Sequence, residues 1–171
     1  MQRDPNYFSK QCRFNACPFV LEPGRPQEDK RRPDVRINPY LNFDGQCEEA
    51  FKFYESVLGG KIEAMIRFDE MPENGNYPLE SAKHIMHTSL KVGDNVLMGS
   101  DAPPPYFKKA EGTSVAINTE TPAEAEKLFA ALSKDAENII LPITETSWAQ
   151  RFAMFVDRFG IPWMINCPKI A

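Results

Sequence analysis

The chain has 171 residues, of which 42% are hydrophobic and 26% are charged, a balance typical of one soluble globular domain. Its 20 Lys and Arg against 24 Asp and Glu give a net charge of −4, so we expect neither nucleic acid nor an anionic membrane as a main partner. Because the sequence has neither a run of 18 apolar residues nor an apolar signal core in its first 30 positions, a cytoplasmic location is expected.

Residues 1–36 differ from the rest of the chain in charge and pattern. They hold eight Lys or Arg and five Asp or Glu, a net charge of +3, whereas residues 37–171 hold 12 and 19, a net charge of −7. The segment also contains five prolines and no sustained apolar period. We therefore predict a poorly ordered extension over residues 1–36 and one globular domain over residues 37–171.

The first half of the domain predicts the order strand, helix, strand, strand, strand. Residues 38–43 form a short strand before the turn Asp44-Gly45-Gln46. In residues 48–58 the apolar positions recur at the spacing of one buried helical stripe, and Gly59-Gly60 ends that helix. The remaining predicted elements are a strand at 62–68, a loop at 69–83, and a hairpin of strands 85–92 and 96–100.

The second half predicts the same order after a linker at residues 102–112. Thr121 is placed to cap a helix, with Pro122 at the first helical position and Glu124 completing a capping box. The other predicted elements are strands at 114–118, 139–144, 153–156 and 163–166. A shift of 75 residues places Ala50 on Ala125, so the two helices share a core pattern.

Two βαβββ modules, residues 37–101 and 113–169, follow from this repeat. Each is too small to close a core alone. The predicted fold class is α+β, with the two modules curling into an incompletely closed mixed β-barrel with its helices outside. Such a barrel leaves a cleft.

The four cysteines do not form a metal motif. Cys12, Cys17, Cys47 and Cys167 lack a CxxC pair and a His at zinc-ligand spacing, which argues against a zinc finger. Buried or unreactive thiols are expected, although Cys12 and Cys17 could pair in an oxidising compartment.

Several segments together resemble a known family. They are residues 38–45, 50–54, the strand from His87 with Gly99-Ser100-Asp101, residues 145–149 and residues 157–166. The combination is similar to the PhnB-like branch of the vicinal oxygen chelate superfamily, which includes glyoxalases, extradiol dioxygenases and fosfomycin and bleomycin resistance proteins. The branch also carries a demethylubiquinone methyltransferase label. The resemblance covers residues 37–169 and implies a glyoxalase-like fold, whereas function must be argued from the site.

The resemblance also implies where metal ligands would lie. In metal-using members four strands supply them, and the corresponding places here are near Pro39, near residues 98–100, at Thr113 and at Met164. None of these is a ligand of the family type. The chain's two histidines, His84 and His87, lie three apart on one strand and so point to opposite faces. We predict no cofactor, with a divalent metal only on an atypical ligand set.

Five residues are candidates for the site. His87 lies mid-strand, where the family pattern also has a His, and could act as a base or donor, or could be a half-buried packing residue. Asp101 could orient a cleft group or start a turn. Trp148 could stack on a planar ligand or pack. Met98 and Met164 could line the cleft or fill gaps.

Two classes of function remain. The first is a binding protein for a small planar or oxygenated compound, of the bleomycin resistance type. The alternative is a lyase, isomerase or dioxygenase that uses His87, with or without an atypical metal site. The sequence contains no GxGxxG, GxxxxGK[ST] or GxSxG motif, and its short turn after the first strand does not support a methyltransferase. We expect a homodimer formed through strand edges and loops.

Overall fold

The computed structural model of the chain describes residues 35–70, 81–102 and 105–169. Contacts within the chain divide it after Arg36, and all the elements below belong to the unit from Ile37 to Ala171. Nearly all of the predicted extension and most of the predicted loop at 69–83 lie outside the described residues. Among the described residues, no helix has the length and apolarity that a membrane span requires.

The first module is a four-stranded sheet with one helix. Its elements are β1 (Tyr40–Phe43), α1 (Cys47–Leu58), β2 (Lys61–Arg67), the short 3-10 helix η1 (Phe68–Glu70), β3 (Ile85–Val92) and β4 (Asn95–Asp101). The strand order is β1-β4-β3-β2, with β1 parallel to β4 and the other pairs antiparallel.

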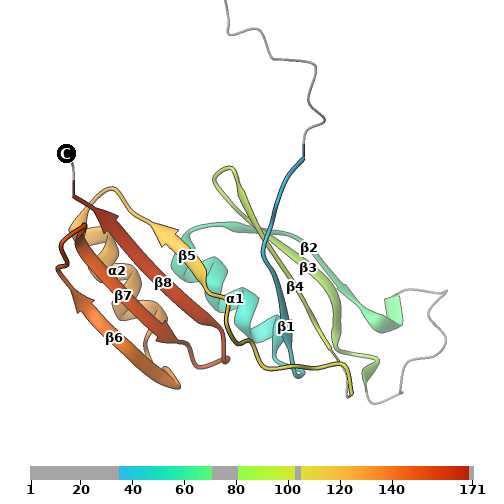
Figure 1. Cartoon of the computed structure of the whole chain (residues 1–171). Helices are drawn as coiled ribbons and strands as arrows, with labels where there is room; N and C mark the ends of the chain where they lie inside the picture. The colour runs from blue at the N-terminus through green and yellow to red at the C-terminus, as the bar shows by residue number, and fades with distance from the viewer. Residues whose placement is uncertain (1–34, 71–80, 103–104, 170–171) are drawn as a thin grey trace, which may run out of the picture. The chain divides into compact units, whose positions relative to one another are not determined.

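The second module repeats this topology. Its elements are β5 (Val115–Asn118), α2 (Pro122–Leu132), β6 (Asn138–Thr144), β7 (Ala149–Val156) and β8 (Pro162–Pro168). The order is β5-β8-β7-β6, again with one parallel and two antiparallel pairs. The predicted pair of βαβββ modules is therefore confirmed, as two separate mixed sheets rather than a closed barrel (Figure 1).

The two helices begin in different ways. The predicted cap of α2 is confirmed, because the Thr121 hydroxyl accepts the Glu124 N–H at 3.3 Å and Pro122 follows at the first helical position. Gln46, before α1, makes no side-chain cap bond. The carboxylate of Asp101, 54 residues away in sequence, instead accepts the Cys47 N–H at 2.9 Å. This helix start thus depends on tertiary structure.

Strand β7 begins earlier than the pattern predicts. Its register against β8 shifts between Ala149 and Arg151, which marks a β-bulge or a similar irregularity. Such an irregularity breaks the alternation of apolar and polar residues, so the sequence pattern identifies only the part from Ala153 onward.

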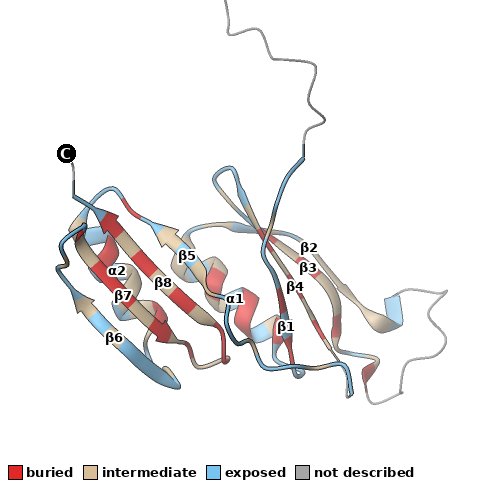
Figure 2. Cartoon of the chain, in the orientation of Figure 1, coloured by how far each residue is buried: buried red, intermediate tan, exposed pale blue. Residues whose placement is uncertain are grey.

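Each helix covers one face of its own sheet, and the core lies between them. Figure 2 shows buried positions along both helices and along the central strands of the sheets. Fully buried core residues include Phe51 of α1, Leu90 of β3, Phe155 of β7 and Trp163 of β8. The core arrangement leaves the opposite face of each sheet without a helix from its own module.

A buried carboxylate joins the two modules. Asp157, which is fully buried after β7, accepts the Tyr54 hydroxyl of α1 at 2.6 Å and the Trp163 indole N–H at 2.8 Å. Its other oxygen accepts the backbone N–H groups of Phe159 and Ile161 at 2.9 and 3.0 Å. Burial, with the adjacent Asp157 charge, raises the pKa of Tyr54 well above its ordinary value. The phenol therefore stays a donor to Asp157.

Candidate functional site

The face of each sheet that points away from its own helix is called the open face here. Cross-strand partners point to the same face, so the strand register defines its members. In the first module the register places Tyr40, Met98, Ser89 and Ala64 in one row. Asn42 and Ser100 form the next pair, and His87 and Ile66 form a pair on β3 and β2.

His87 lies on this open face beside Tyr40. The Tyr40 Oη and His87 Nδ1 atoms are 3.3 Å apart, and the two rings stack with centroids 5.9 Å apart at an interplanar angle of 27°. Tyr40 is 44% exposed, and Met98 is its partner on β4. The structure thus brings two predicted residues, His87 and Met98, together around a tyrosine.

The sequence reasoning missed Tyr40, although a signal was present. Tyr40 lies in the predicted first strand, in the segment that carries the family resemblance. Its neighbour Leu41 is buried, so period-two alternation alone places Tyr40 on the opposite face. An imidazole beside a phenol offers hydrogen-bond donors and acceptors to a bound ligand.

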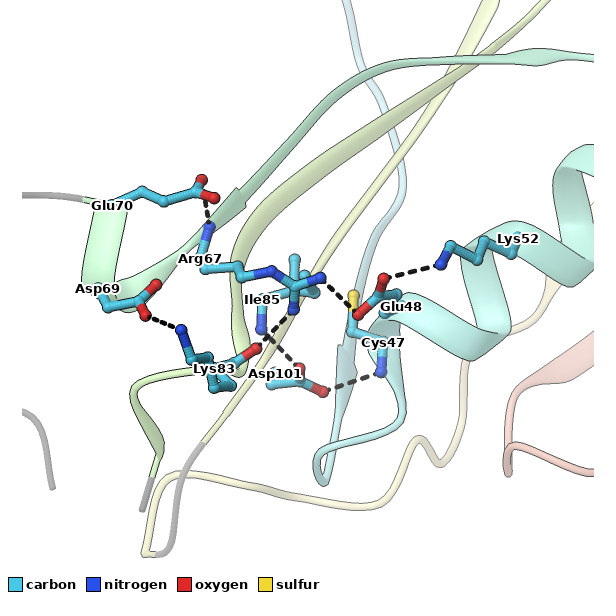
Figure 3. Close-up of polar contacts among 9 residues, drawn as sticks. All are labelled: Cys47, Glu48, Lys52, Arg67, Asp69, Glu70, Lys83, Ile85 and Asp101. Atoms are coloured by element: carbon cyan, nitrogen blue, oxygen red, sulfur yellow. Dashed lines mark hydrogen bonds and ion pairs between the residues drawn. The ribbon is translucent and has the colours of Figure 1, made fainter. Parts of the chain in front are cut away.

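Asp101 lies elsewhere, on the helix-facing side, and is only 3% exposed. One oxygen accepts the Cys47 N–H at 2.9 Å and the other accepts the Ile85 N–H at 2.8 Å (Figure 3). These bonds hold the start of α1 and the start of β3 against the end of β4. Asp101 therefore has a structural role. From the sequence, a ligand-orienting role or a turn role was expected instead.

Charged side chains beside Asp101 pair with one another. Arg67 donates to Glu48 Oε2 and to the Lys83 carbonyl, both at 2.8 Å, and Lys83 donates to Asp69 at 2.7 Å (Figure 3). The bonds from Lys52 and Arg67 lower the pKa of Glu48. This network ties the end of β2 and the following segment to α1, so these charges serve the architecture of the module.

The open face of the second module has an equivalent layout. The register places Ala116, Met164, Met154 and Leu141 in one row, and Asn118, Asn166, Phe152 and Thr144 in the next. Met98 and Met164 thus occupy equivalent positions on the fourth strands of the two modules. Asn166 Nδ2 donates to Asn118 Oδ1 at 3.0 Å, which links the first and fourth strands across this face.

Trp148 lies just before β7 and is 60% exposed. Its ring packs edge-on against Phe152, with the centroids 5.6 Å apart. His87 belongs to the other sheet, and the ring contacts found for these two side chains among the described residues stay within their own modules. A site shared by His87 and Trp148 within one chain stays a prediction.

The open-face positions on the first and fourth strands include two of the four places where the resemblance puts metal ligands, residues 98–100 and Met164, whereas Pro39 and Thr113 lie just before β1 and β5. The open-face positions are occupied by Tyr40 and Met98, Asn42 and Ser100, Ala116 and Met164, and Asn118 and Asn166. Within residues 35–70, 81–102 and 105–169, no three His, Cys, Asp or Glu side chains lie close enough to hold a metal ion. The donor set at these positions does not fit a family-type metal site.

His84 and two of the thiols lie apart from the open faces. The His84 ring packs against the turn at Gly45, where an added Cβ would lie 3.3 Å from its Nε2 atom. Cys47 and Cys167 are buried free thiols, as expected, and burial raises the pKa of Cys47 far above its ordinary value. Cys12 and Cys17 lie outside the described residues.

The structure also holds a groove of about 810 Å³, which shares Ala116 and Asn118 with the open face of the second sheet. The last turn of α1, the β3–β4 hairpin, β5 and α2 line it, together with residues 37–39. None of the five predicted site residues lines this groove. It is therefore a competing location for a ligand.

Comparison with known proteins identifies the family. The family model described as 3-demethylubiquinone-9 3-methyltransferase matches residues 35–166. The chain belongs to this family. It is 30% identical over 141 residues to Protein YjdN of Escherichia coli (strain K12), covering 78% of this chain and 95% of that protein.

Solved structures agree with this assignment. The crystal structure of protein PA1353 from Pseudomonas aeruginosa is 43% identical, covers 80% of this chain and 99% of its own, and superposes with a TM-score of 0.73. A glyoxylase/bleomycin resistance protein/dioxygenase domain from Frankia sp. EAN1pec is 12% identical, covers 81% and 100%, and gives a TM-score of 0.55. The second likeness shows the fold alone, which is glyoxalase-like as predicted.

Proposed function

We propose that this chain is a small-molecule-binding protein of the glyoxalase/bleomycin resistance type, with its ligand held against the open faces of the sheets. The observation that carries the proposal is the grouping of Tyr40, His87 and Met98 on the open face of the first sheet. Phenol, imidazole and thioether groups on rigid strands offer hydrogen bonds and adaptable apolar contact to a small planar compound.

The second sheet supports the same proposal. Its open face carries Met164 and the Asn118–Asn166 amide pair, and Trp148 lies at its edge next to Phe152. A half-exposed indole of this kind can stack on a flat ligand. Asp101, with both oxygens bound to backbone N–H groups, is not part of the proposed surface.

A methyltransferase activity is not supported by the fold, despite the description of the family. The usual cofactor-binding methyltransferase needs a parallel sheet with a glycine-rich turn after the first strand. Here both sheets are mixed, and β1 leads into α1 through Asp44-Gly45-Gln46. The proposal therefore assigns binding rather than methyl transfer.

The Tyr40–His87 contact favours one alternative, an isomerase, lyase or dioxygenase that uses His87. In that case His87 would exchange a proton with the substrate while Tyr40 orients the imidazole. We propose no resident metal, because the open-face positions of the first and fourth strands offer no His or carboxylate. Metal analysis of protein purified without chelator tests this, and a full equivalent bound at the open faces would contradict it.

We further propose that the protein acts as a homodimer. The strands β1 and β5 are edge strands of their sheets, and a second copy could cover their free edges. Light scattering at micromolar concentration should give twice the 19.4 kDa chain mass. A single 19.4 kDa species would contradict the dimer without affecting the ligand surface.

The binding proposal is tested by screening planar oxygenated compounds for thermal stabilisation and titrating the hits by calorimetry. Trp148→Ala should weaken binding by about 1 to 3 kcal/mol if the indole stacks on the ligand. His87→Ala should weaken binding modestly, whereas loss of all turnover of a hit would favour the enzyme alternative. Tyr106→Ala is the control, since Tyr106 is 77% exposed in the linker and lies outside the proposed surface.

A further inference from the structure

We infer that the ligand of the open faces carries an anionic group, which Lys61 and Lys91 hold at one end of the first sheet. The inference rests on the proposed function and adds the chemical class of the ligand. Its starting point is the strand register. Lys61 of β2 and Lys91 of β3 are cross-strand partners. Lys91 follows Ser89 by two residues, so both lysines lie on the open face. Their row is next to the row that contains Tyr40 and Met98.

The charges of these two lysines are only weakly neutralised. Like charges directly opposite each other on a sheet destabilise the pair. Glu63 is the one carboxylate that pairs with either lysine in the described part of the chain, and its Oε1 atom lies 3.9 Å from the Lys91 Nζ atom. Both side chains of this ion pair are 52% exposed, and an exposed pair contributes little. Lys61 is exposed and forms no ion pair with the described residues. This end of the open face therefore keeps a net positive charge.

The second module shows that the fold does not require lysines at these positions. The repeat places Asn138 of β6 and Val156 of β7 at the equivalent positions, and they too are cross-strand partners. In the four strands of the second sheet, all of which are described, the single charged residue is Arg151. It faces the helix, because it donates to Glu126 of α2 at 2.6 Å. Among the described strands, the positive charge of the open faces thus belongs to one end of the first sheet.

Protection of a sheet edge does not account for both lysines. Lysine is common on edge strands, where its charge prevents pairing with another chain. Lys61 lies on the edge strand β2, but Lys91 lies on β3, which pairs with β2 on one side and with β4 on the other (Figure 1). A cation on a central strand does not protect an edge. An anionic partner on the open face accounts for both lysines.

The two rows together define the shape of the ligand. Adjacent rows lie about 7 Å apart along a strand. A flat compound can therefore lie against Tyr40 and Met98 while its acidic group meets the two ammonium groups, which are carried on flexible four-carbon stems. The Ser89 hydroxyl lies beside them and can donate a hydrogen bond to the same group. Pairing with two cations recovers the hydration that an anion loses on binding. The ligand is thus a planar compound with a carboxylate or a similar oxyanion.

Matched neutral and anionic probes test this inference. 2-Naphthamide and 2-naphthoate share one ring system, and 3,4-dihydroxybenzamide and 3,4-dihydroxybenzoate share another. The full chain is labelled at its methionine methyl carbons, and the signals of Met98, Met154 and Met164 are assigned with Met→Leu variants. In buffer of low ionic strength at pH 7.5, at least one anionic probe should shift the Met98 signal and bind about fivefold more tightly than its amide.

Lysine variants locate the effect of charge. The double variant Lys61→Gln with Lys91→Gln should remove the preference for the anionic probe and leave the affinity for its amide unchanged. The matched control is Lys108→Gln with Lys134→Gln, which removes the same charge from two exposed positions outside the strands and should change neither affinity. A preference that persists in the Lys61 and Lys91 variant, or that the control also loses, would overturn the inference.

The possible outcomes separate the inference from the proposed function. Amides that bind as tightly as their acids, with a shift of the Met98 signal, would overturn the inference and leave the proposed function standing. An anionic probe that shifts only Met154 or Met164 would place the anion on the second sheet and would also overturn the inference. Failure of all four probes to shift any of the three signals would contradict the proposed function, and the inference with it.

Discussion

The two faces of each sheet use polar chemistry in opposite ways. The helix-facing side buries two carboxylates, Asp101 and Asp157, and bonds both oxygens of each one. The open side holds amides, hydroxyls, an imidazole and thioethers in its register-defined rows. The difference indicates that the buried carboxylates fix the architecture, while the partly exposed groups of these rows are left to meet a ligand.

This comparison predicts two separable classes of variant. Substitutions of the helix-facing carboxylates should lower the free energy of unfolding, because each removes an acceptor from several buried donors. Substitutions on the open faces, apart from the buried Phe152, should change ligand affinity and leave stability nearly unchanged, because the other side chains are only partly buried or exposed.

The largest effect is expected for Asp157→Ala. It removes the acceptor of four hydrogen bonds and leaves the Tyr54 hydroxyl and the Trp163 indole N–H buried without it. Urea unfolding should show a loss of about 3 to 5 kcal/mol. Asp94→Ala, in the exposed turn of the other module, is the control and should change stability by less than about 0.5 kcal/mol. Equal losses of unfolding free energy in Asp157→Ala and Asp94→Ala would contradict the structural role given to the buried carboxylates.

A smaller loss is expected for Asp101→Ala. Two backbone N–H groups, of Cys47 and Ile85, lose their acceptor, which predicts a cost of about 2 to 3 kcal/mol in urea unfolding. Asp44→Ala, in the exposed turn before α1, should have little effect. If ligand binding failed in Asp101→Ala while stability stayed normal, Asp101 would belong to the site after all.

Tyr54→Phe tests the single hydrogen bond that joins the two modules through Tyr54 and Asp157. The variant keeps the ring and removes the hydroxyl that donates to Asp157, so it should cost about 1 to 2 kcal/mol of unfolding free energy. Tyr106→Phe, on a 77% exposed side chain, is the control. Equal free energies of unfolding for the two variants would show that the Tyr54–Asp157 hydrogen bond does not stabilise the fold.

A smaller, pH-dependent effect is expected at Glu48. Lys52 and Arg67 lower its pKa in the folded state, so the ionised carboxylate stabilises the fold at pH values above the unfolded pKa. That contribution should disappear as the pH falls from about 4.5 through the lower folded-state pKa. Glu48→Gln should flatten this part of the stability profile in urea titrations at pH 3 to 6. An identical profile in the variant would contradict the assignment.

The smallest effect on stability is expected for Trp148→Ala. The indole is 60% exposed and packs edge-on against Phe152, so its loss should cost less than about 1 kcal/mol of unfolding free energy. A loss of 3 kcal/mol or more would make Trp148 a core residue and would remove it from the ligand surface.

Local patterns were enough to predict the modules. Period-two and helical spacing, the Thr121–Glu124 cap and the glycines after α1 all depend on residues close in sequence. The start of β7 was not predicted, because the register shift near Arg151 breaks the alternation of apolar and polar residues.

The site was predictable only in part, since its contacts join distant residues. Tyr40 and His87 are 47 positions apart, and the Asp157–Tyr54 bond spans 103 positions. Asp101 appeared to be a turn or ligand residue because its two donors, Cys47 and Ile85, are identified only once β4 is placed in the sheet. Alternation could place a side chain on a face, but it could not identify that side chain's partner.

The location of a bound ligand tests the central claim most directly. A crystal of the full chain soaked with the tightest-binding planar compound from the screen should show this probe against Tyr40, His87 and Met98. Density for the probe in the groove of about 810 Å³ between α1, β5 and α2, with the open faces empty, would contradict the account.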